Sequence, residues 1–329
     1  MTTGNFVWSW RDARFGAVIT AIPFVVMITG HVEAGLPLLI GSLPAALVGL
    51  LPTKKQRKKL VVLGLLFGVF LMLGSFMAQW VWVAIPGMFM LAFGSAILAS
   101  RRPFGVIALT LCVPVAGVGL SYGGLENSVG LGLLIILGSI VAYGWSLCFK
   151  EHDQPLANRQ AKTSILSKVQ SQNYGIRLGV AVAISTSIGY ALGADHIGWI
   201  TGATLFVMRP DREVQKLRSV GRAVSVFIGA MIASWLLTLN LQPVIVAILS
   251  AGALIMASAT HTSRWYITPA FSTFLVFWIL LYGEPTITNI EYRFNERVFE
   301  TLLGISIAYV FGIVVPYMAS RLSLRDETY

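Results

Sequence analysis

Long apolar stretches alternate with short polar segments along nearly the whole chain. A membrane-spanning helix needs about 20 mostly apolar residues. Stretches near this length cover residues 14–31, 35–52, 60–78, 80–99, 103–121, 129–149, 174–192, 196–209, 221–239, 242–260, 265–283 and 296–318. The pattern predicts an all-α polytopic membrane bundle of about twelve transmembrane helices. The shortest segment, 196–209, is expected either to tilt or to extend toward Lys216.

A polar stretch near the middle of the chain divides these segments into six and six. We expect a membrane repeat over 1–149, a cytoplasmic linker over 150–173 and a second membrane repeat over 174–329. Similar sequences open the two halves (Arg14-Phe-Gly-Ala-Val and Arg177-Leu-Gly-Val-Ala). An even number of spans makes such repeats parallel, which is a known plan of transporters. The alternative is that two Gly-rich apolar halves resemble each other by chance.

Composition and charge support a lipid-facing protein. Hydrophobic residues make up 56% of the 329 and charged residues only 12%, whereas soluble domains carry about 25% charged residues. The net charge of +10 does not indicate a nucleic-acid partner, because the basic residues lie in short loops between apolar segments. With both termini cytoplasmic, 22 of the 24 basic residues fall on the inside and only Arg293 and Arg297 fall outside, as the positive-inside rule describes.

Several motifs for enzymatic or ATP-driven chemistry are missing from the sequence. It contains no GxxxxGK[ST] loop, HExxH or CxxC pattern. The four histidines and two cysteines are scattered, so we expect neither a metal site nor a catalytic dyad, and no cofactor. ATP-driven transport would require a separate nucleotide-binding subunit.

The segment around Pro210 carries the most informative motif. An apolar stretch ends at Met208, Arg209-Pro210-Asp211 follows, and a basic segment leads into Arg222-x-x-Ser225-Val226-x-x-Gly229. A second element is Arg297-Val-Phe-Glu300-Thr301-Leu-Leu-Gly304. Over roughly 174–318 the chain resembles the fusaric acid resistance and aromatic acid exporter superfamily. The family's Gly-Thr pair is absent, since Ser225 and Val226 stand there.

The resemblance implies a secondary exporter of aromatic or other carboxylic acids, driven by protons, in a bacterial inner membrane. Its implied partners are the organic anion substrate, membrane lipid and a separate periplasmic adaptor subunit, and a homo-oligomer is compatible with it. Larger relatives carry a cytoplasmic domain between two six-helix units, and here only the linker occupies that place.

Four charged residues share one broad face of the last predicted helix. Arg293, Glu296, Arg297 and Glu300 stand three or four positions apart, and Thr301 follows. We hypothesise that Glu300 is a proton-coupling carboxylate and that Arg297 pairs with it or contacts the anion. Arg222 is a further candidate, since a charged residue in a span is expected to face protein or water. The alternative is a static ion pair that orients the helix.

A second set of candidates is basic and cytoplasmic. Arg209, Arg212, Lys216 and Arg218, with Arg222, would form an electropositive vestibule that gathers anions. The alternative is that these residues only determine topology and contact anionic lipid.

Other functions compatible with the sequence are a passive anion channel of the same superfamily and a non-transporting membrane scaffold or assembly subunit. A channel would conduct without proton coupling, and a scaffold would lack convergent polar groups in its interior. A membrane-embedded enzyme ranks last, because no metal-ligand pattern is present and the histidines are scattered.

Overall fold

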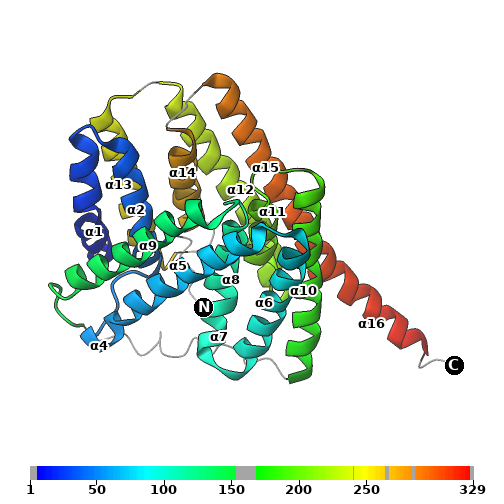
Figure 1. The fold of residues 1–329 in the computed structure, drawn as a ribbon. Coiled ribbons are helices and arrows are strands. Elements are labelled where there is room, and N and C mark those ends of the chain that lie inside the picture. The colour runs from blue at the N-terminus through cyan, green and yellow to red at the C-terminus, as the bar shows by residue number, and fades with distance from the viewer. Residues whose placement is uncertain (1–5, 153–167, 240, 264–266, 283–285, 327–329) are drawn as a thin grey trace. The chain divides into compact units, whose positions relative to one another are not determined.

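The computed structural model describes residues 6–152, 168–239, 241–263, 267–282 and 286–326. Within these ranges the chain forms helices joined by short turns, and no β-strand occurs there (Figure 1). Most of the predicted linker lies outside the described residues, and helix α10 already begins in its last part, at Lys168.

Each apolar segment predicted in the first half is occupied by helix. The elements are α1 (Trp10–Ile28), α2 (Val32–Gly41), α3 (Leu43–Val48), α4 (Lys54–Arg57), α5 (Lys59–Ala78), α6 (Val81–Arg101), α7 (Pro103–Ile107), the π-helical turn η1 (Ala108–Cys112), α8 (Val113–Gly119) and α9 (Leu125–Ser146). One predicted span, 35–52, is interrupted at Ser42 and ends in an extended segment from Gly49 to Thr53.

Helices likewise occupy the apolar segments predicted in the second half of the chain. It contains α10 (Lys168–Ala191), α11 (Gly198–Val207), α12 (Arg212–Leu237), α13 (Pro243–Ala259), α14 (Ile267–Leu281), α15 (Ile287–Tyr309), the π-helical turn η3 (Val310–Val314) and α16 (Val315–Asp326). Two helices begin earlier than their apolar patterns predict, α12 at Arg212 rather than 221 and α15 at Ile287 rather than 296. The prediction of an all-α membrane bundle is confirmed.

Several helices are long and apolar enough to cross a bilayer. Five such stretches are Lys54–Ala78, Val81–Arg101, Ser128–Ser146, Arg212–Leu237 and Ile287–Ala319. Large apolar side chains lie on the surface along these helices, for example Trp82, Val220 and Trp235. A soluble monomer rarely exposes apolar surface on this scale, so the chain is a multi-pass membrane protein.

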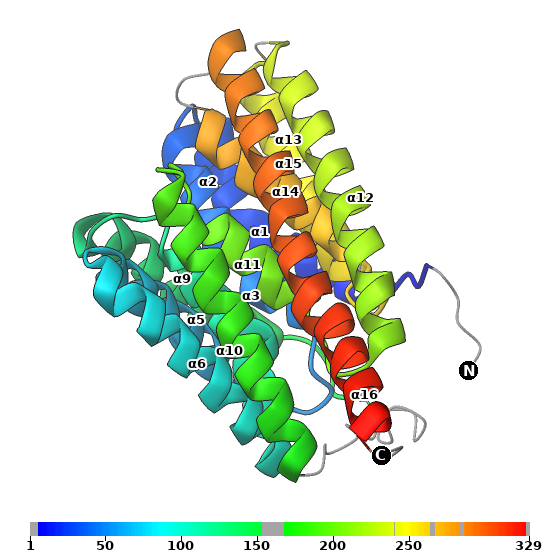
Figure 2. The same cartoon turned by 90° about the vertical axis from the view of Figure 1, so that its right-hand side faces the viewer.

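The helices group into two compact units that do not follow the two halves of the sequence. Unit 1 comprises 1–69, 129–161 and 224–298, and unit 2 comprises 70–128, 162–223 and 299–329. In unit 1, α1 packs along α13, and in unit 2, α10 packs along α6 (Figures 1 and 2). The first helix of each half therefore packs against the fourth predicted span of the other half. The repeat relation between the halves stays a prediction.

Unit 1 contains the segments around Lys54–Arg57 and Lys150, which the distribution of basic residues predicts to be cytoplasmic. Arg57 is fully buried, and its five N–H groups donate to the carbonyl oxygens of Leu51, Pro52, Ser146, Phe149 and Lys150. The guanidinium thus joins the segment before α4 to the C-terminal end of α9. These contacts agree with a common membrane face for the two segments.

The two π-helical turns share a cause in the sequence. Each is followed at the second position by a proline, Pro114 after η1 and Pro316 after η3. Proline lacks the N–H that would continue the helical hydrogen bonds, and a π-turn accommodates the break. Carbonyl groups near η3 consequently bind side chains of other helices in unit 2.

Candidate functional site: buried arginines at the end of helix α11

Helix α11 is half as long as a membrane span and lies in the interior. Its ten residues extend about 15 Å, against about 30 Å for a hydrocarbon core. All of them except Phe206 are buried. Pro210 disfavours helical geometry at Arg209, so the predicted extension toward Lys216 does not occur. A helix that ends inside a protein leaves carbonyl groups that need donors.

Three arginines converge on this helix end. Arg209 donates through Nη1 to the carbonyl oxygens of Leu205 at 2.9 Å and Met208 at 2.6 Å. Arg218 donates to the carbonyl oxygen of Phe206 at 3.3 Å. The guanidinium carbon of Arg222 lies 4.9 Å from the centre of the Phe206 ring. We call Arg209, Arg218 and Arg222 the arginine cluster.

Two further polar side chains complete the surroundings of the arginine cluster. The Tyr174 hydroxyl donates to the Met208 carbonyl at 3.2 Å. Gln215 accepts from the Arg209 backbone N–H at 3.2 Å and donates to the carbonyl of Ala308 at 2.7 Å. Both side chains are buried. They fix the extended segment after α11 against α10, α12 and α15 within unit 2.

Helix α12 turns its polar face inward. Gln215, Ser219 and Arg222 are buried, and they repeat at the spacing of one helix face. Large apolar residues of the same turns, Leu217 and Val220, are 59% and 66% exposed. An aqueous surface would favour the opposite arrangement. The basic segment that leads to Arg222 is therefore only partly solvated, because Arg222 is buried and Arg218 is half-buried.

The charge at this site is positive. Arg209 is 8% exposed, and its side chain contacts the carbonyl oxygens of Leu205 and Met208 and the Tyr174 hydroxyl. Arg177 on α10 likewise donates to the carbonyls of Asn173 and Phe311, and both arginines lie within Coulombic range of Tyr174. A helix C-terminus offers about −0.5 charge, which is less than one guanidinium carries. The carbonyl groups at this helix end therefore offset only part of the charge of Arg209.

Comparison with known proteins agrees with the motifs in this region. Residues 182–311 match the family described as fusaric acid resistance protein-like. This match covers 130 of the 329 residues and includes the arginine cluster. An uncharacterized protein of Synechocystis sp. is 24% identical over 152 residues, 46% of this chain and 20% of that relative. The match thus spans about a fifth of the relative's length, and no solved structure matches the chain.

The structure divides the predicted vestibule into buried inner members and exposed outer members. Arg209 and Arg222 are buried and Arg218 is half-buried. Arg212 and Lys216 are exposed, and Lys216 forms an ion pair with Glu213 at 2.9 Å. The structure therefore brings Arg209, Arg218 and Arg222 together and leaves Arg212 and Lys216 at the surface.

The charged residues of α15 lie deeper in the helix than their sequence pattern predicts. Arg297, Glu300 and Thr301 are 7%, 2% and 2% exposed, and Arg297 is the eleventh residue of α15 rather than a member of its first turn. Arg222 is likewise the eleventh residue of α12. The predicted spans begin at 221 and 296, which would place both arginines at helix starts. This expectation is wrong, because both helices extend into the polar sequence before the apolar pattern begins.

The α15 side chains differ in their contacts. Arg293 and Glu296 form the predicted i,i+3 pair, with Nη1 and Oε2 2.8 Å apart. The Thr301 hydroxyl is buried without a hydrogen-bond partner among the described residues. Glu300 is the most deeply buried acid of this group, and intramembrane acids that face protein commonly serve in transport.

Two motif glycines lie at close helix crossings in the region that matches the family. A Cβ on Gly304 would lie 2.5 Å from the carbonyl oxygen of Ile200, and the Gly304 carbonyl accepts from the Thr204 hydroxyl at 3.1 Å. A Cβ on Gly229 would lie 2.6 Å from the carbonyl oxygen of Ala270. The motif thus fixes how α15 meets α11 and how α12 meets α14.

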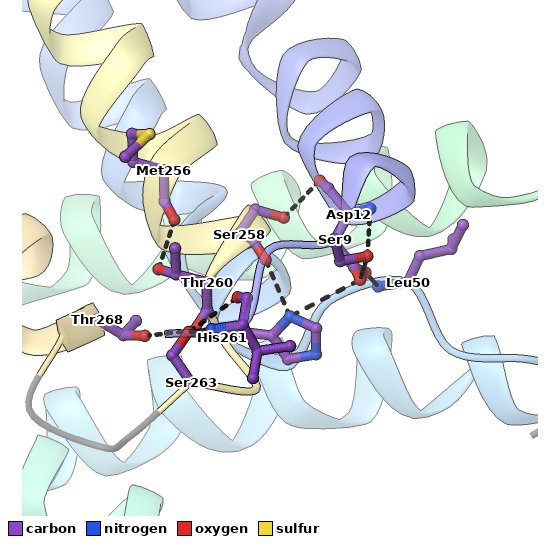
Figure 3. Close-up of polar contacts among 10 residues, drawn as sticks. Ser9, Asp12, Leu50, Met256, Ser258, Thr260, His261, Ser263 and Thr268 are labelled. Carbon is purple, nitrogen blue, oxygen red and sulfur yellow. Dashed lines mark hydrogen bonds and ion pairs between the residues drawn. The ribbon is translucent and has the colours of Figure 1, made fainter. Parts of the chain in front are cut away.

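Sequence reasoning missed several buried polar residues. Gln215 could have been noticed from its helical spacing with Arg222. Tyr174 and Arg177 give no such signal, because they bind the carbonyl groups of Met208 and Phe311, which are distant in the sequence. In unit 1, Asp12 and His261 were also missed, and they approach each other across a separation of 249 positions (Figure 3). Among the described residues, no group of three metal-binding side chains occurs.

Proposed function

We propose that this protein is a secondary exporter of organic anions, aromatic or other carboxylic acids, driven by the proton gradient. It resides in a bacterial inner membrane with both termini cytoplasmic. The family described as fusaric acid resistance protein-like supports a role in transport and resistance. A separate adaptor subunit would continue the export path in the periplasm.

The observation that carries this proposal is the arginine cluster at the end of α11. A buried guanidinium that meets carbonyl groups and a tyrosine hydroxyl, as Arg209 does, leaves positive potential in a region of low dielectric constant. Guanidinium groups bind carboxylates with two parallel hydrogen bonds. The Phe206 ring beside Arg222 adds an aromatic surface, which suits substrates that carry a ring as well as a carboxylate.

Proton coupling is assigned to Glu300. A buried carboxyl group that binds and releases a proton changes the local charge by one unit, and in a low-dielectric interior this biases which conformation is stable. Arg297 and Thr301 share its helix face. In Glu300→Gln, which cannot titrate, we expect acid transport that no longer depends on the proton gradient. An unchanged proton dependence in this variant removes Glu300 from the coupling role.

The proposal is tested by efflux of a panel of radiolabelled aromatic carboxylates from cells with and without the protein. We expect faster efflux of at least one acid with the protein present and loss of this difference when an uncoupler is added. No difference for any acid would contradict the proposal. Efflux that persists in the uncoupler together with electrical conductance would instead identify a passive anion channel.

A further inference from the structure

Gln215 on α12 joins the segment that follows α11 to helix α15 within unit 2. Its side chain is fully buried. The amide oxygen accepts from the Arg209 backbone N–H at 3.2 Å, and the amide nitrogen donates to the Ala308 carbonyl at 2.7 Å. One neutral side chain therefore contacts both the segment that carries Arg209 and the helix that carries Glu300.

The chain leaves space for this amide at Gly312. A Cβ on Gly312 would overlap the amide atoms of Gln215. Gly312 is buried in the π-helical turn η3 and does not have a positive φ. The approach of Gln215, rather than an unusual backbone conformation, therefore accounts for a glycine at this position.

The π-helical turn explains why side chains can bind the backbone here. In an α-helix each carbonyl accepts from the N–H four residues later, and a π-turn shifts this pattern by one residue. Ala308 stands two residues before η3, and its carbonyl accepts from Gln215. Phe311 lies within η3, and its carbonyl accepts from Arg177 of α10. Two neighbouring helices thus hold the chain where its own hydrogen-bond pattern changes.

The amide of Gln215 completes a short route between two candidate residues. Glu300 stands on α15 eight residues before Ala308, which corresponds to about 12 Å along the helix axis. The Gln215 amide then bridges Ala308 to the Arg209 backbone. A second contact, from the Thr204 hydroxyl to an α15 carbonyl at 3.1 Å, holds α11 itself. Gln215, by contrast, holds the extended segment from which the Arg209 side chain projects.

We propose that Gln215 is a positioning residue that transmits movement of α15 to the Arg209 guanidinium. This proposal rests on the proposed function, in which Glu300 takes up a proton and Arg209 contacts the anion. Helix shifts of about 1–2 Å are typical of switching proteins, and a hydrogen bond lengthened by that amount is broken. Because a buried amide without partners is costly, a shift of α15 carries Gln215 and the Arg209 backbone with it.

Hydrogen exchange of the full-length protein in nanodiscs tests the link without any substrate. Arg209→Gln removes the bonds of the guanidinium to the end of α11, and we expect the peptide covering 305–314 to exchange about three-fold faster. Gln215→Met keeps the length of the side chain but cannot form the two bonds. In this background Arg209→Gln should cause no further change in the peptide. An equal effect of Arg209→Gln in both backgrounds, or none in either, would overturn the proposal.

Two further backgrounds guard against a general loss of folding. Gly312→Ala displaces the same amide from the other side, so it should also remove the effect of Arg209→Gln. Ser306→Ala is the matched control, since Ser306 is exposed on α15 and bonds locally to the Leu302 carbonyl. In the Ser306→Ala background the effect of Arg209→Gln should persist, and its loss there would contradict a specific role of Gln215.

Uptake of radiolabelled benzoate into proteoliposomes, corrected for protein-free liposomes, tests the role in transport. For Gln215→Met we expect accumulation driven by a pH gradient to fall about ten-fold, while benzoate exchange without a gradient stays within about two-fold of the wild type. A residue that served only stability would lower both rates together, and this result would overturn the proposal. If the wild type transports no aromatic carboxylate, the proposed function fails, and hydrogen exchange still decides the link through Gln215.

Discussion

Two buried arginines in this protein bind mainly to backbone carbonyl groups. Arg57, the last residue of α4 in unit 1, and Arg209, which follows α11 in unit 2, both donate to carbonyls near a helix end. A lipid environment has no water to satisfy such carbonyls, so a guanidinium with five donors is an efficient partner. The two arginines differ in one respect, since Arg57 uses all five donors and Arg209 keeps a buried Nε without a partner among the described residues.

Replacement of Arg57 by Ala should strongly destabilise the protein. The change leaves five carbonyl groups without their donor, and we expect a loss of about 3 kcal/mol or more, because hydrogen bonds to charged groups are worth about 1.5–3 kcal/mol each. Arg57→Lys, with three donors, should lose less. Thermal unfolding of the purified protein measures both. The exposed neighbour Lys58 provides the control Lys58→Ala, and equal melting temperatures for R57A and K58A would contradict this role.

His152 should make the protein less stable in mild acid. Its pKa is lowered in the folded state by burial and by Arg11 and Arg57, below an unfolded value of about 6.5. Above that pH the ring is neutral in both the folded and the unfolded state, so its burial does not make the stability depend on pH. As the pH decreases through the folded-state pKa, the unfolded state binds the proton more readily and the stability of the folded state falls. Thermal unfolding between pH 8 and pH 5 should show a shallower decline for His152→Gln than for the wild type. Parallel declines would show that His152 does not carry the effect.

At the scale of helices, small residues decide where one backbone can approach another. α15 crosses α11 at Gly304, where the Thr204 hydroxyl binds the Gly304 carbonyl. Helix association in membranes depends on such close packing, because lipid supplies little hydrophobic drive between helices. Within unit 2, the short helix α11 thus contacts α15 at Gly304 and packs against α8.

Gly304→Leu should separate α15 from α11. Overpacking of this kind typically costs about 1–3 kcal/mol, and the displaced helix end should also disturb the arginine cluster. We expect a lower melting temperature and reduced transport. Gly94→Leu in α6 is the matched control, since a Cβ there meets nothing within 4 Å. If both leucine variants behave alike, the crossing at Gly304 is not critical.

On the whole-molecule scale, the apolar pattern predicted the helices well but not their partners. A span is encoded locally by about 20 apolar residues, so every predicted segment carries helix. The pairing of α1 with α13 depends on tertiary fit, such as Gly16 against Ser258, which no local pattern contains. For the same reason Arg209 and Arg218 were found as candidates by charge, whereas Tyr174, Gln215, Asp12 and His261 were not.

The topology that this account assumes is testable by labelling. In a background with Cys112→Ala and Cys148→Ser, the exposed positions Lys55 and Asp211 are each changed to Cys. A membrane-impermeant maleimide should label K55C and D211C from the cytoplasmic side, and E33C and G123C from the other. Labelling of positions 55 and 211 on opposite faces would refute the arrangement of spans.

The central claim is that an organic anion crosses the membrane by way of the inward arginines of unit 2. Its most direct test is uptake of a radiolabelled aromatic carboxylate into proteoliposomes under an imposed pH gradient. Arg209→Gln, Arg218→Gln and Arg222→Gln are compared with the exposed controls Arg212→Gln and Lys216→Gln, all with normal melting temperatures. We predict at least about ten-fold slower transport for each inner variant, the effect of losing about 1.4 kcal/mol of binding, and near wild-type rates for the outer two. Equal effects at inner and outer positions, or none at either, would contradict the account.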